Sequence, residues 1–285
     1  MKIAHIITAY KNPEQVSKLI KALDHPDFYF FIHLDKKIDR SKFDFLGEYE
    51  RVVFIKDRVL CNWGGFSFVN AILNSIREVL ADAAKFDFIN LLSGQDYPIK
   101  PVKDIYSFLN NNIGKCFLSY DTDPNHQWWK HAIKRTELYH FTDISFRGKY
   151  FVQGLLNKYL PVRKLPVPIE LYGNNDSSWW TLSPDCCAYV LDYVATHRRL
   201  TKFMKYTWAA DEFFITSIIM NSPFKDKVIN NNLRYITWSV GLPNPHILTL
   251  NDLKDIKQSD KFFARKFDTT VDASIFDAID TYIQQ

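Results

Sequence analysis

Residues 3–23 read IAHIITAYKNPEQVSKLIKAL, an apolar, β-branched run that passes into a segment with a helical period. The run over residues 3–8 predicts a strand. Asn12 is then expected to cap a helix that has Pro13 at its first position and Gln15 as its capping-box partner. The apolar side chains that follow share one helical face: Val16, Leu19, Ile20 and Leu23. A strand that passes directly into a helix is therefore the first unit of the fold.

The same alternation continues through the first half of the chain. Apolar runs predict further strands over residues 28–34, 52–55, 86–92 and 115–120. A helix is expected over residues 68–81, with one face turned inward: Ala71, Ile72, Ile76 and Val79. Strands that alternate with helices of this length indicate an α/β fold with a mainly parallel central sheet covered by helices.

The second half of the chain is less regular. From about residue 128 the pattern loosens, and we expect loops over residues 139–165 and over the proline-rich residues 164–168. Regular structure is expected again in three places: residues 179–182, a helix after Pro184 and a helix over residues 211–220. Because no linker divides the chain, we predict a single elaborated domain over residues 1–285.

Composition excludes several classes of protein. None of the nine glycines has G-x-G-x-x-G or G-x-x-x-x-G-K-[ST] spacing, which excludes both glycine-rich phosphate cradles. The formal net charge is +4 with mixed signs, whereas a nucleic-acid surface needs clustered cations. Basic patches at residues 130–135 and at Arg163 and Lys164 are interpreted as solvated faces, with a phosphate or an anionic membrane as the alternative partner. Aromatic residues form 16% of the chain and either fill a core or line a site for flat or sugar-like ligands.

Cysteine usage and hydropathy indicate the compartment. The adjacent Cys186 and Cys187 could close only a strained bridge, so free thiols in a reducing compartment are expected. The apolar run at the N-terminus is too short for a signal peptide, and no apolar run reaches the roughly 18 residues of a membrane span. We therefore expect a soluble, cytoplasmic protein.

Polar clusters follow three of the predicted strands, at residues 8–11, 35–37 and 94–96. In open parallel sheets, ligands bind beyond the carboxyl ends of the strands. The sequence therefore predicts a ligand site where these three clusters meet.

Two pairs of carboxylates are candidates for chemistry. Asp121 and Asp123 follow a predicted strand, a pattern typical of a divalent cation held on a diphosphate, or of a turn that closes before Pro124. Asp211 and Glu212 open a predicted helix rich in aromatic and aliphatic residues. One of these two suits a general base beside aromatic walls, and stabilisation of the helix terminus is the alternative.

Cations and tryptophans also stand in suggestive surroundings. Arg265 and Lys266 lie among aromatic residues, where they suit the fixed positive charge that a leaving diphosphate needs in the absence of a metal. The alternative is a pair of cations lying over a hydrophobic patch. Three tryptophans beside polar residues suit either sugar platforms or a core: Trp179, Trp180 and Trp238.

The order of these segments resembles the core-2/I-branching N-acetylglucosaminyltransferase and peptide O-xylosyltransferase family, glycosyltransferase family 14, and especially its small bacterial members. The matching segments run from residue 9 to residue 268 and read AYKNPEQ, IHLDKK, WGGFS, LLSGQDYP, SWWTLS, DEFF, LRYI and FARKFD. The resemblance implies a GT-A-like fold, with residues 1–125 as the nucleotide-binding half and residues 126–285 as the acceptor and catalytic half. It also implies an inverting, metal-independent transfer of a sugar, GlcNAc or xylose, from a UDP-sugar to a glycan hydroxyl.

The resemblance further assigns residues to roles. Glu212 would be the catalytic base, and Lys266 with Arg265 would meet the diphosphate. The other donor-binding residues would be Thr8, Ala9, Asp35 and Asp96, with His246 standing where relatives carry a second basic residue. The acceptor-binding residues would be Trp179, Trp180, Asp211, Arg234 and Trp238. The sequence departs from the family pattern at Ala210 and Thr237, where relatives often carry Pro and Asp.

The implied partners are a UDP-sugar donor and a glycan or glycolipid acceptor, with no nucleic acid and no metal or other cofactor. A role in surface-polysaccharide assembly would add a peripheral contact with the inner face of a membrane. Two alternatives stay open. One is a metal-dependent GT-A glycosyltransferase that uses Asp121 and Asp123, and the other is a non-catalytic sugar-binding module.

Overall fold

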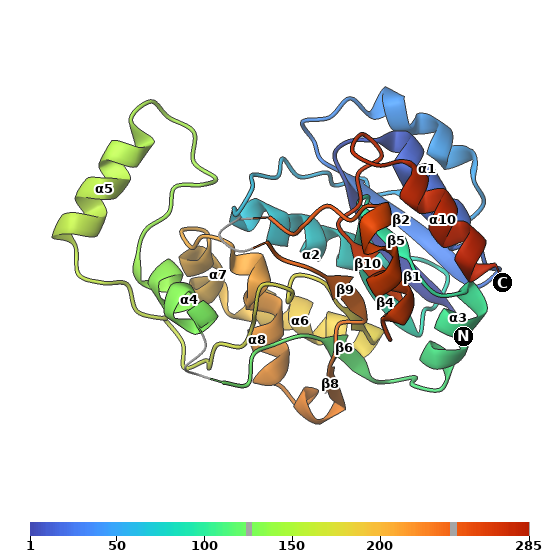
Figure 1. Ribbon diagram of the computed structural model, residues 1–285. Coiled ribbons are helices and arrows are strands. Elements are labelled where there is room, and N and C mark those ends of the chain that lie inside the picture. The colour runs from blue at the N-terminus through green and yellow to red at the C-terminus, as the bar shows by residue number, and fades with distance from the viewer. Residues whose placement is uncertain (124–126, 240–243, 285) are drawn as a thin grey trace.

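The computed structural model describes residues 1–123, 127–239 and 244–284 (Figure 1). Within these residues a seven-stranded sheet has the order β3-β2-β1-β4-β7-β6-β8. Its strands are β1 (Ile3–Ala9), β2 (Phe28–Leu34), β3 (Val52–Phe54), β4 (Phe88–Ser93), β6 (Cys116–Leu118), β7 (Thr181–Leu182) and β8 (Val228–Asn230). Strands β2 and β4 lie parallel to β1 on either side of it, and β7 runs antiparallel between β4 and β6. The expected α/β fold with a mainly parallel sheet is confirmed.

A smaller sheet, of three described strands, continues from the carboxyl end of β4. Its order is β5-β10-β9, with β5 at Asp96–Pro98, β10 at Phe263–Arg265 and β9 at Arg234–Ile236. Strand β10 pairs antiparallel with β5 and parallel with β9. This pairing sets Arg265 opposite Asp96 in register, so the C-terminal part of the chain is brought back to the edge where the parallel strands end.

Helices cover both faces of the large sheet. The described α-helices are α1 (Pro13–Ala22), α2 (Phe66–Ala81), α3 (Val102–Asn110), α4 (Gln127–Glu137), α5 (Lys149–Tyr159), α6 (Pro184–Thr196), α7 (Arg198–Met204), α8 (Phe214–Met220), α9 (Leu253–Gln258) and α10 (Ser274–Ile283). The short 3₁₀ helices are η1 (Arg40–Glu48), η2 (Ala210–Glu212), η3 (Lys225–Lys227) and η4 (Leu250–Asp252). None of the described helices is long and apolar enough to cross a bilayer.

The two faces of β1 explain its unbroken apolar run. Ala4 and Ile6 belong to a core that includes residues of α2, α6 and α8. Ile3 and Ile7 belong to a second core that includes residues of α1, α3 and α10. Because both faces are covered, the strand has no solvent side that would call for alternating polar residues.

Two expectations for the second half are wrong. Residues 139–165 are not all loop, because α5 lies within them and stands apart from the body of the ribbon (Figure 1). The helix expected over residues 211–220 begins only at Phe214, since Phe213, with φ −152°, interrupts the helical path. Asp211 and Glu212 lie in η2 instead, so neither carboxylate lies in the first turn of α8.

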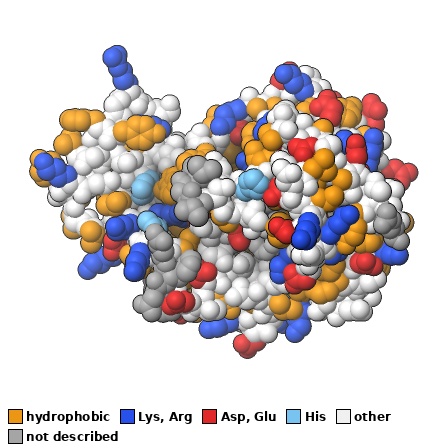
Figure 2. Space-filling model, in the orientation of Figure 1, with side chains coloured by type: hydrophobic (Ala, Val, Ile, Leu, Met, Phe, Trp, Pro, Cys, Tyr) orange, Lys and Arg blue, Asp and Glu red, His pale blue; other side chains and the backbone are white. Residues whose placement is uncertain are grey.

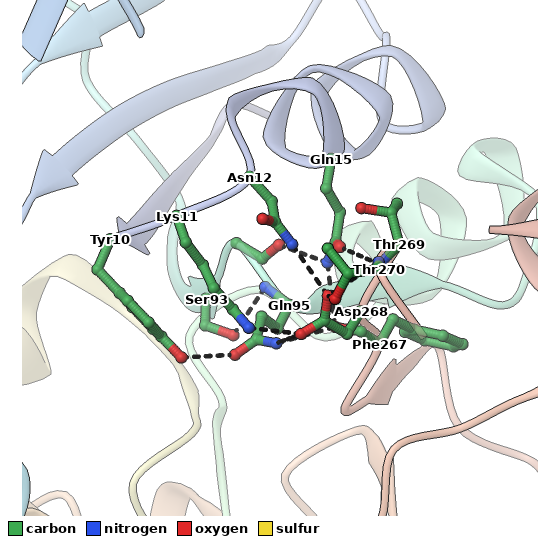
Figure 3. Close-up of polar contacts among 11 residues, drawn as sticks. Tyr10, Lys11, Asn12, Gln15, Ser93, Gln95, Phe267, Asp268, Thr269 and Thr270 are labelled. Carbon is green, nitrogen blue, oxygen red and sulfur yellow. Dashed lines mark hydrogen bonds and ion pairs between the residues drawn. The ribbon is translucent and has the colours of Figure 1, made fainter. Parts of the chain in front are cut away.

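Asn12 stands at the N-cap position of α1 and Pro13 at its first helical position, as expected, but the expected side-chain cap and the capping box with Gln15 are wrong. Asn12 has a left-handed backbone (φ 53°), and its side-chain amide donates to Asp268 at 3.0 Å. The Gln15 amide donates to the carbonyl oxygens of Gly94 and Phe267. Both side chains therefore make long-range contacts where a local cap was expected (Figure 3).

Asp268 lies at the centre of these contacts (Figure 3). Its carboxylate accepts hydrogen bonds from Lys11 at 2.5 Å, from Asn12 and from Thr270 at 2.7 Å. Burial raises the pKa of Asp268, but the hydrogen bonds from Lys11 and Thr270 outweigh it and hold the pKa well below its ordinary value. An ionised carboxylate thus fastens the loop after β1 to the chain after β10.

We expect Asp268→Asn to lower the free energy of unfolding at pH 7 by about 2 kcal/mol, because hydrogen bonds to a charged acceptor are lost. The folded-state pKa of Asp268 is depressed, so its contribution is present above the unfolded-state pKa of about 3.9 and is lost as the pH falls towards the folded value. The difference between wild type and variant should therefore shrink below about pH 4. Urea denaturation followed by circular dichroism at several pH values measures it.

Asp277→Asn is the matched control for that experiment. The Asp277 carboxylate makes an exposed pair with Lys18, and such pairs contribute little. The control should stay close to wild type at every pH. A loss at Asp268 that did not depend on pH would contradict the role of the ionised carboxylate.

Candidate active site

A cavity of about 620 Å³ opens at the carboxyl edge of the parallel strands. Its floor is built from residues at the ends of β1, β2 and β4: Thr8, Ala9, Asp35 and Ser93. The parallel register of these strands, which pairs Thr8 with both His33 and Ser93, brings the three polar clusters together. A cavity therefore lies at the edge where the ligand site was predicted.

Asp35 is held firmly at the end of β2. Its Oδ1 accepts from the N–H of Lys37 at 2.9 Å, and its Oδ2 lies 3.8 Å from the Lys37 ammonium. The Arg58 guanidinium donates to the carbonyl oxygens of Leu34, Asp35 and Ile38, which fixes the loop after the strand. The loop therefore presents a carboxylate and a short run of backbone to the cavity in one defined conformation.

Arg265 places a buried cation in the cavity wall. Its guanidinium lies 3.8 Å from the centre of the Trp179 ring, and its Nε lies 3.5 Å from Asp96 Oδ1. Among the described residues, neither Nε nor Nη1 of Arg265 has a hydrogen-bond acceptor, although both are buried. Burial lowers the pKa of Arg265, and Asp96 opposes that effect. A buried guanidinium with unpaired N–H groups is suited to an anionic ligand.

Lys266 lines the same cavity directly after Arg265. Burial lowers the pKa of its ammonium, and the neighbouring cations Arg265 and Lys11 lower it further. The chain thus concentrates positive charge at one wall, and an anion bound there would relieve this repulsion.

Glu212 lies in another part of the cavity lining, within η2. Its Oε2 accepts hydrogen bonds from Arg135 at 2.5 Å and from the Trp128 indole at 3.2 Å. Burial raises the pKa of Glu212, Arg135 opposes the rise, and the neighbouring Asp211 adds to it. A carboxylate that is buried, oriented and more basic than usual has the properties of a general base.

Asp211 supports Glu212 from the adjacent position. Its Oδ2 accepts from the Ser178 hydroxyl at 2.8 Å, and burial raises its pKa. Both residues line the cavity, as does Ser178. Hydrogen bonds from Ser178, just before β7, and from α4 thus hold the two carboxylates in place.

Tryptophan side chains form much of the remaining wall. Trp238 is 36% exposed, and its indole N–H donates to Asp176 at 2.8 Å. Trp63 and Trp208 meet edge to face at 5.3 Å, and the Arg135 guanidinium lies 4.6 Å from the Trp208 ring centre. Aromatic faces with polar groups at their rims are typical of sugar-binding sites.

The structure brings most of the predicted site residues around this one cavity. Those that line it are Thr8, Ala9, Asp35, Trp179, Asp211, Glu212, Trp238, Arg265 and Lys266. Four others are not among the described residues that line it, and their binding roles stay predictions: Asp96, Trp180, Arg234 and His246. Each of the four has another role in the fold.

Asp96 and His246 lie behind the cavity wall or beside it. Asp96 is fully buried, accepts from the N–H of Ser93 at 2.7 Å and faces Arg265, so it positions that cation. His246 Nε2 lies 3.3 Å from Asp252 Oδ2, at the capping box of η4. Neither residue is among the described residues that line the cavity.

Trp180 and Arg234 belong to the interior. Trp180 is 1% exposed and packs in the core beneath the sheet. The Arg234 guanidinium donates to the side chain of Asn90, to the Thr181 hydroxyl at 3.0 Å and to the carbonyl oxygen of Leu91 at 2.9 Å. Burial lowers the pKa of Arg234 to about 9. This residue ties β9 to β4 and β7 and is not among the described residues that line the cavity.

Asp121 and Asp123 do not line the cavity either. Among the described residues, no group of three or more His, Cys, Asp or Glu side chains could hold a metal ion. Pro124, where a turn was the alternative, lies outside the described residues.

Arg135 and Trp128, which both contact Glu212, were not predicted as site residues. Arg135 falls in the basic patch that was interpreted as a solvated face. The two residues are seven positions apart, two turns of helix, and so share a face of α4. That spacing was the available signal, but only the fold shows that the face meets η2.

The fold and the cavity define an α/β protein with a cavity at the carboxyl edge of its parallel strands. A family model described as Core-2/I-Branching enzyme matches residues 3–259, and the chain belongs to that family. Xylosyltransferase 2 of Rattus norvegicus is 26% identical over 308 residues, which cover 99% of this chain and 34% of that protein. The chain spans about a third of the length of the curated relatives it matches.

Solved structures with a similar arrangement include two transferases. Mouse xyloside xylosyltransferase 1, in its apo form, has a TM-score of 0.38 and 12% identity, covering 78% of this chain and 83% of that chain. The galactosyltransferase LgtC, in complex with donor and acceptor sugar analogs, has a TM-score of 0.44 and 10% identity, covering 99% of this chain and 96% of that chain.

The buried position of Arg234 leads to a prediction about stability. We expect Arg234→Met to lower the free energy of unfolding by about 3 kcal/mol, because several buried acceptors would lose their donor. Urea denaturation measures the change. Arg199→Met, at an exposed position of α7, is the control and should change stability by less than about 0.5 kcal/mol. Unchanged stability of the Arg234 variant would reopen a direct role in ligand binding.

Proposed function

We propose that the protein transfers a sugar from a UDP-sugar to a hydroxyl group of a glycan, with inversion and without a metal ion, on a GT-A-like fold. The observation that carries this proposal is the buried guanidinium of Arg265. It leaves Nε and Nη1 without acceptors in the described structure and stands next to Lys266, in the same cavity as the oriented carboxylate Glu212. A fixed pair of cations and a general base are the groups that such a transfer needs.

The donor would lie along the strand ends. Thr8, Ala9 and Asp35 would contact the uridine, whose ring and ribose offer hydrogen-bonding groups to backbone and carboxylate partners. The diphosphate would then reach Arg265 and Lys266. These cations would stabilise the negative charge that grows on the leaving UDP, which is the charge that a bound divalent ion neutralises in metal-dependent enzymes.

Glu212 would act on the acceptor. Its carboxylate removes the proton from an acceptor hydroxyl, whose oxygen attacks the anomeric carbon from the face opposite the diphosphate. The bond between that carbon and the diphosphate breaks, and UDP leaves with the electron pair. Arg135 positions Glu212 and favours its ionised form, while burial keeps it basic.

The aromatic wall suits an acceptor sugar. Trp238 and Trp179 both line the cavity, and Trp238 keeps about a third of its surface exposed for stacking. GlcNAc and xylose are the donor sugars we propose, and the names of the xylosyltransferase relatives favour xylose. The acceptor would be a glycan or a glycolipid at the cytoplasmic face of a membrane, and the four free cysteines suit that reducing compartment.

Replacement of the base tests the mechanism. We expect Glu212→Gln to lower sugar transfer by at least about a thousandfold, because proton removal by a positioned base contributes a factor of that order. UDP binding should stay within about twofold of wild type, since Glu212 is not part of the donor contacts. A panel of UDP-sugars assayed for UDP release, together with calorimetry for UDP binding, gives both numbers.

Glu170→Gln is the control for this substitution, because Glu170 is an exposed carboxylate that does not line the cavity. It should transfer sugar at the wild-type rate. Full activity in the Glu212 variant would overturn the assignment of the base. If the wild-type protein releases UDP from none of the UDP-sugars in the panel, a non-catalytic sugar-binding module would be favoured.

Metal removal tests the remaining alternative. We expect the transfer rate to be unchanged within about twofold in EDTA, because Arg265 and Lys266 supply the positive charge. The double variant Asp121→Asn, Asp123→Asn should likewise keep its activity in EDTA. Activity that EDTA abolishes and Mn²⁺ restores in the wild type, but not in the double variant, would move the role to those two carboxylates.

A further inference from the structure

An arm of the chain, residues 144–169, carries a cluster of exposed hydrophobic side chains on and around α5. Phe151 and Tyr159 are about 70% exposed, and Leu155 between them is 40% exposed. These three residues recur every fourth position and so form one stripe along α5. Other exposed hydrophobic side chains of the arm surround the stripe: Phe146, Tyr150, Leu160 and Val162. Figure 2 shows hydrophobic and cationic side chains gathered over this arm, at the left of the view.

The side of α5 that faces the protein carries two amides, Gln153 and Asn157, together with the half-buried Val152 and Leu156. The backbone N–H of Phe141 donates to the Gln153 side chain at 2.7 Å. The Asn157 amide makes a pair of hydrogen bonds, of 2.7 and 3.0 Å, with the backbone of Tyr139. None of the residues of α5, all of which the structure describes, is buried. The amides thus hold α5 to the preceding segment while its hydrophobic stripe faces solvent, whereas an ordinary surface helix turns such a stripe to the core.

The arm is also purely cationic. Residues 144–169 contain no Asp or Glu, and the cations Arg147, Lys158 and Lys164 are exposed, with Lys149 half-buried. Arg163 is the exception, because its guanidinium is buried and donates to the carbonyl oxygens of Leu138 and Tyr206. The expected solvated patch at Arg163 and Lys164 is therefore corrected: one of the two cations fixes the base of the arm.

We propose that this arm docks the protein on an anionic lipid bilayer. Exposed aromatic and aliphatic side chains partition into the headgroup region, and tyrosine is favoured at that interface because its ring is apolar and its hydroxyl is polar. Cations without neighbouring acids are attracted to anionic headgroups. A hydrophobic stripe flanked by exposed cations matches both properties of such a surface, whereas a neutral protein partner would leave the cations without counterions.

The arm is joined rigidly to the rim of the cavity. Just before it, Asp143 accepts from the Asn62 amide at 3.1 Å and from the Ser67 backbone N–H at 2.8 Å, and Asn62 lines the cavity. Where the chain returns from α5, Arg163 donates to the carbonyl oxygen of Tyr206, two residues before the cavity residue Trp208. A docked arm would therefore hold the cavity close to the bilayer surface. The docking itself does not depend on which reaction the cavity performs.

Vesicle binding tests this proposal. The full chain is mixed with large vesicles of phosphatidylcholine alone, or with about 30% phosphatidylglycerol, and bound protein is measured by flotation. We expect binding to the anionic vesicles only, and release when the salt concentration is raised from about 0.1 M to about 1 M, which shortens the screening length from about 10 Å to about 3 Å. Phe151→Ser with Tyr159→Ser, and Arg147→Glu with Lys158→Glu, should each weaken the binding by at least about tenfold.

Matched variants elsewhere on the surface are the controls. Ile113→Ser with Val271→Ser removes exposed aliphatic side chains, and Lys103→Glu with Lys254→Glu reverses exposed charges outside the arm. Both controls should bind vesicles as the wild type does. All variants should keep the wild-type circular dichroism spectrum, since the substituted side chains are exposed.

Two results would overturn the proposal. One is equal binding by the arm variants and the controls, which would show that general charge attracts the protein to lipid. The other is failure of the wild type to bind anionic vesicles. In that case, sedimentation would identify the arm as a contact between copies of the chain if the wild type is a dimer and the Phe151→Ser, Tyr159→Ser variant is a monomer. The outcome of the UDP-sugar assays has no bearing on either result.

Discussion

The Asp268 carboxylate is the contact on which the geometry of the cavity depends. It joins Lys11, after the first strand, to a segment 257 positions later in the chain (Figure 3). Arg265 and Lys266 lie just before Asp268, so the same contact determines where these cations stand relative to the strand ends. A fold of this kind can place charge beside a ligand only by closing a long loop, and closure requires strong, specific bonds at the point where the ends meet.

Burial of charge is the second constraint, because a desolvated ion is costly unless a partner compensates it. The two buried charges of the cavity, Glu212 and Arg265, are compensated to different degrees. Glu212 has Arg135 and Trp128 as direct partners, which orient its carboxylate and oppose the rise in its pKa that burial causes. Arg265 has Asp96 at a longer distance and an aromatic face beneath it, which leaves part of its hydrogen-bonding capacity unused among the described residues. The asymmetry separates a group that is ready to accept a proton from a group that is ready to receive an anion.

Local patterns in the sequence were sufficient for β1, β2, α2 and the meeting of polar clusters at the strand ends, because apolar period and strand direction decide them. They failed where distant contacts decide. Asn12 and Gln15 read as a helix cap, yet Asp268, Gly94 and Phe267 take their side chains. The hydrophobic periodicity also did not predict α3, α4, α7, α9 and α10. Helix α5 was not predicted because its hydrophobic stripe faces outward and not towards a core. Residue spacing alone cannot show whether a polar side chain will bond to its own helix or to a residue that is distant in the sequence.

The outward hydrophobic stripe of α5 has a consequence for how such a chain could diverge. Since the helix contributes no buried side chain, its outer face can change without opening the core, provided that Gln153 and Asn157 still satisfy the backbone of Tyr139 and Phe141. The hydrogen bonds of two amide residues therefore hold the helix in place, and the residues of its outer face are free to determine which surface it binds. Transplanting a different outer face onto the same two anchors would change the surface that the helix recognises while leaving the interior of the protein unchanged.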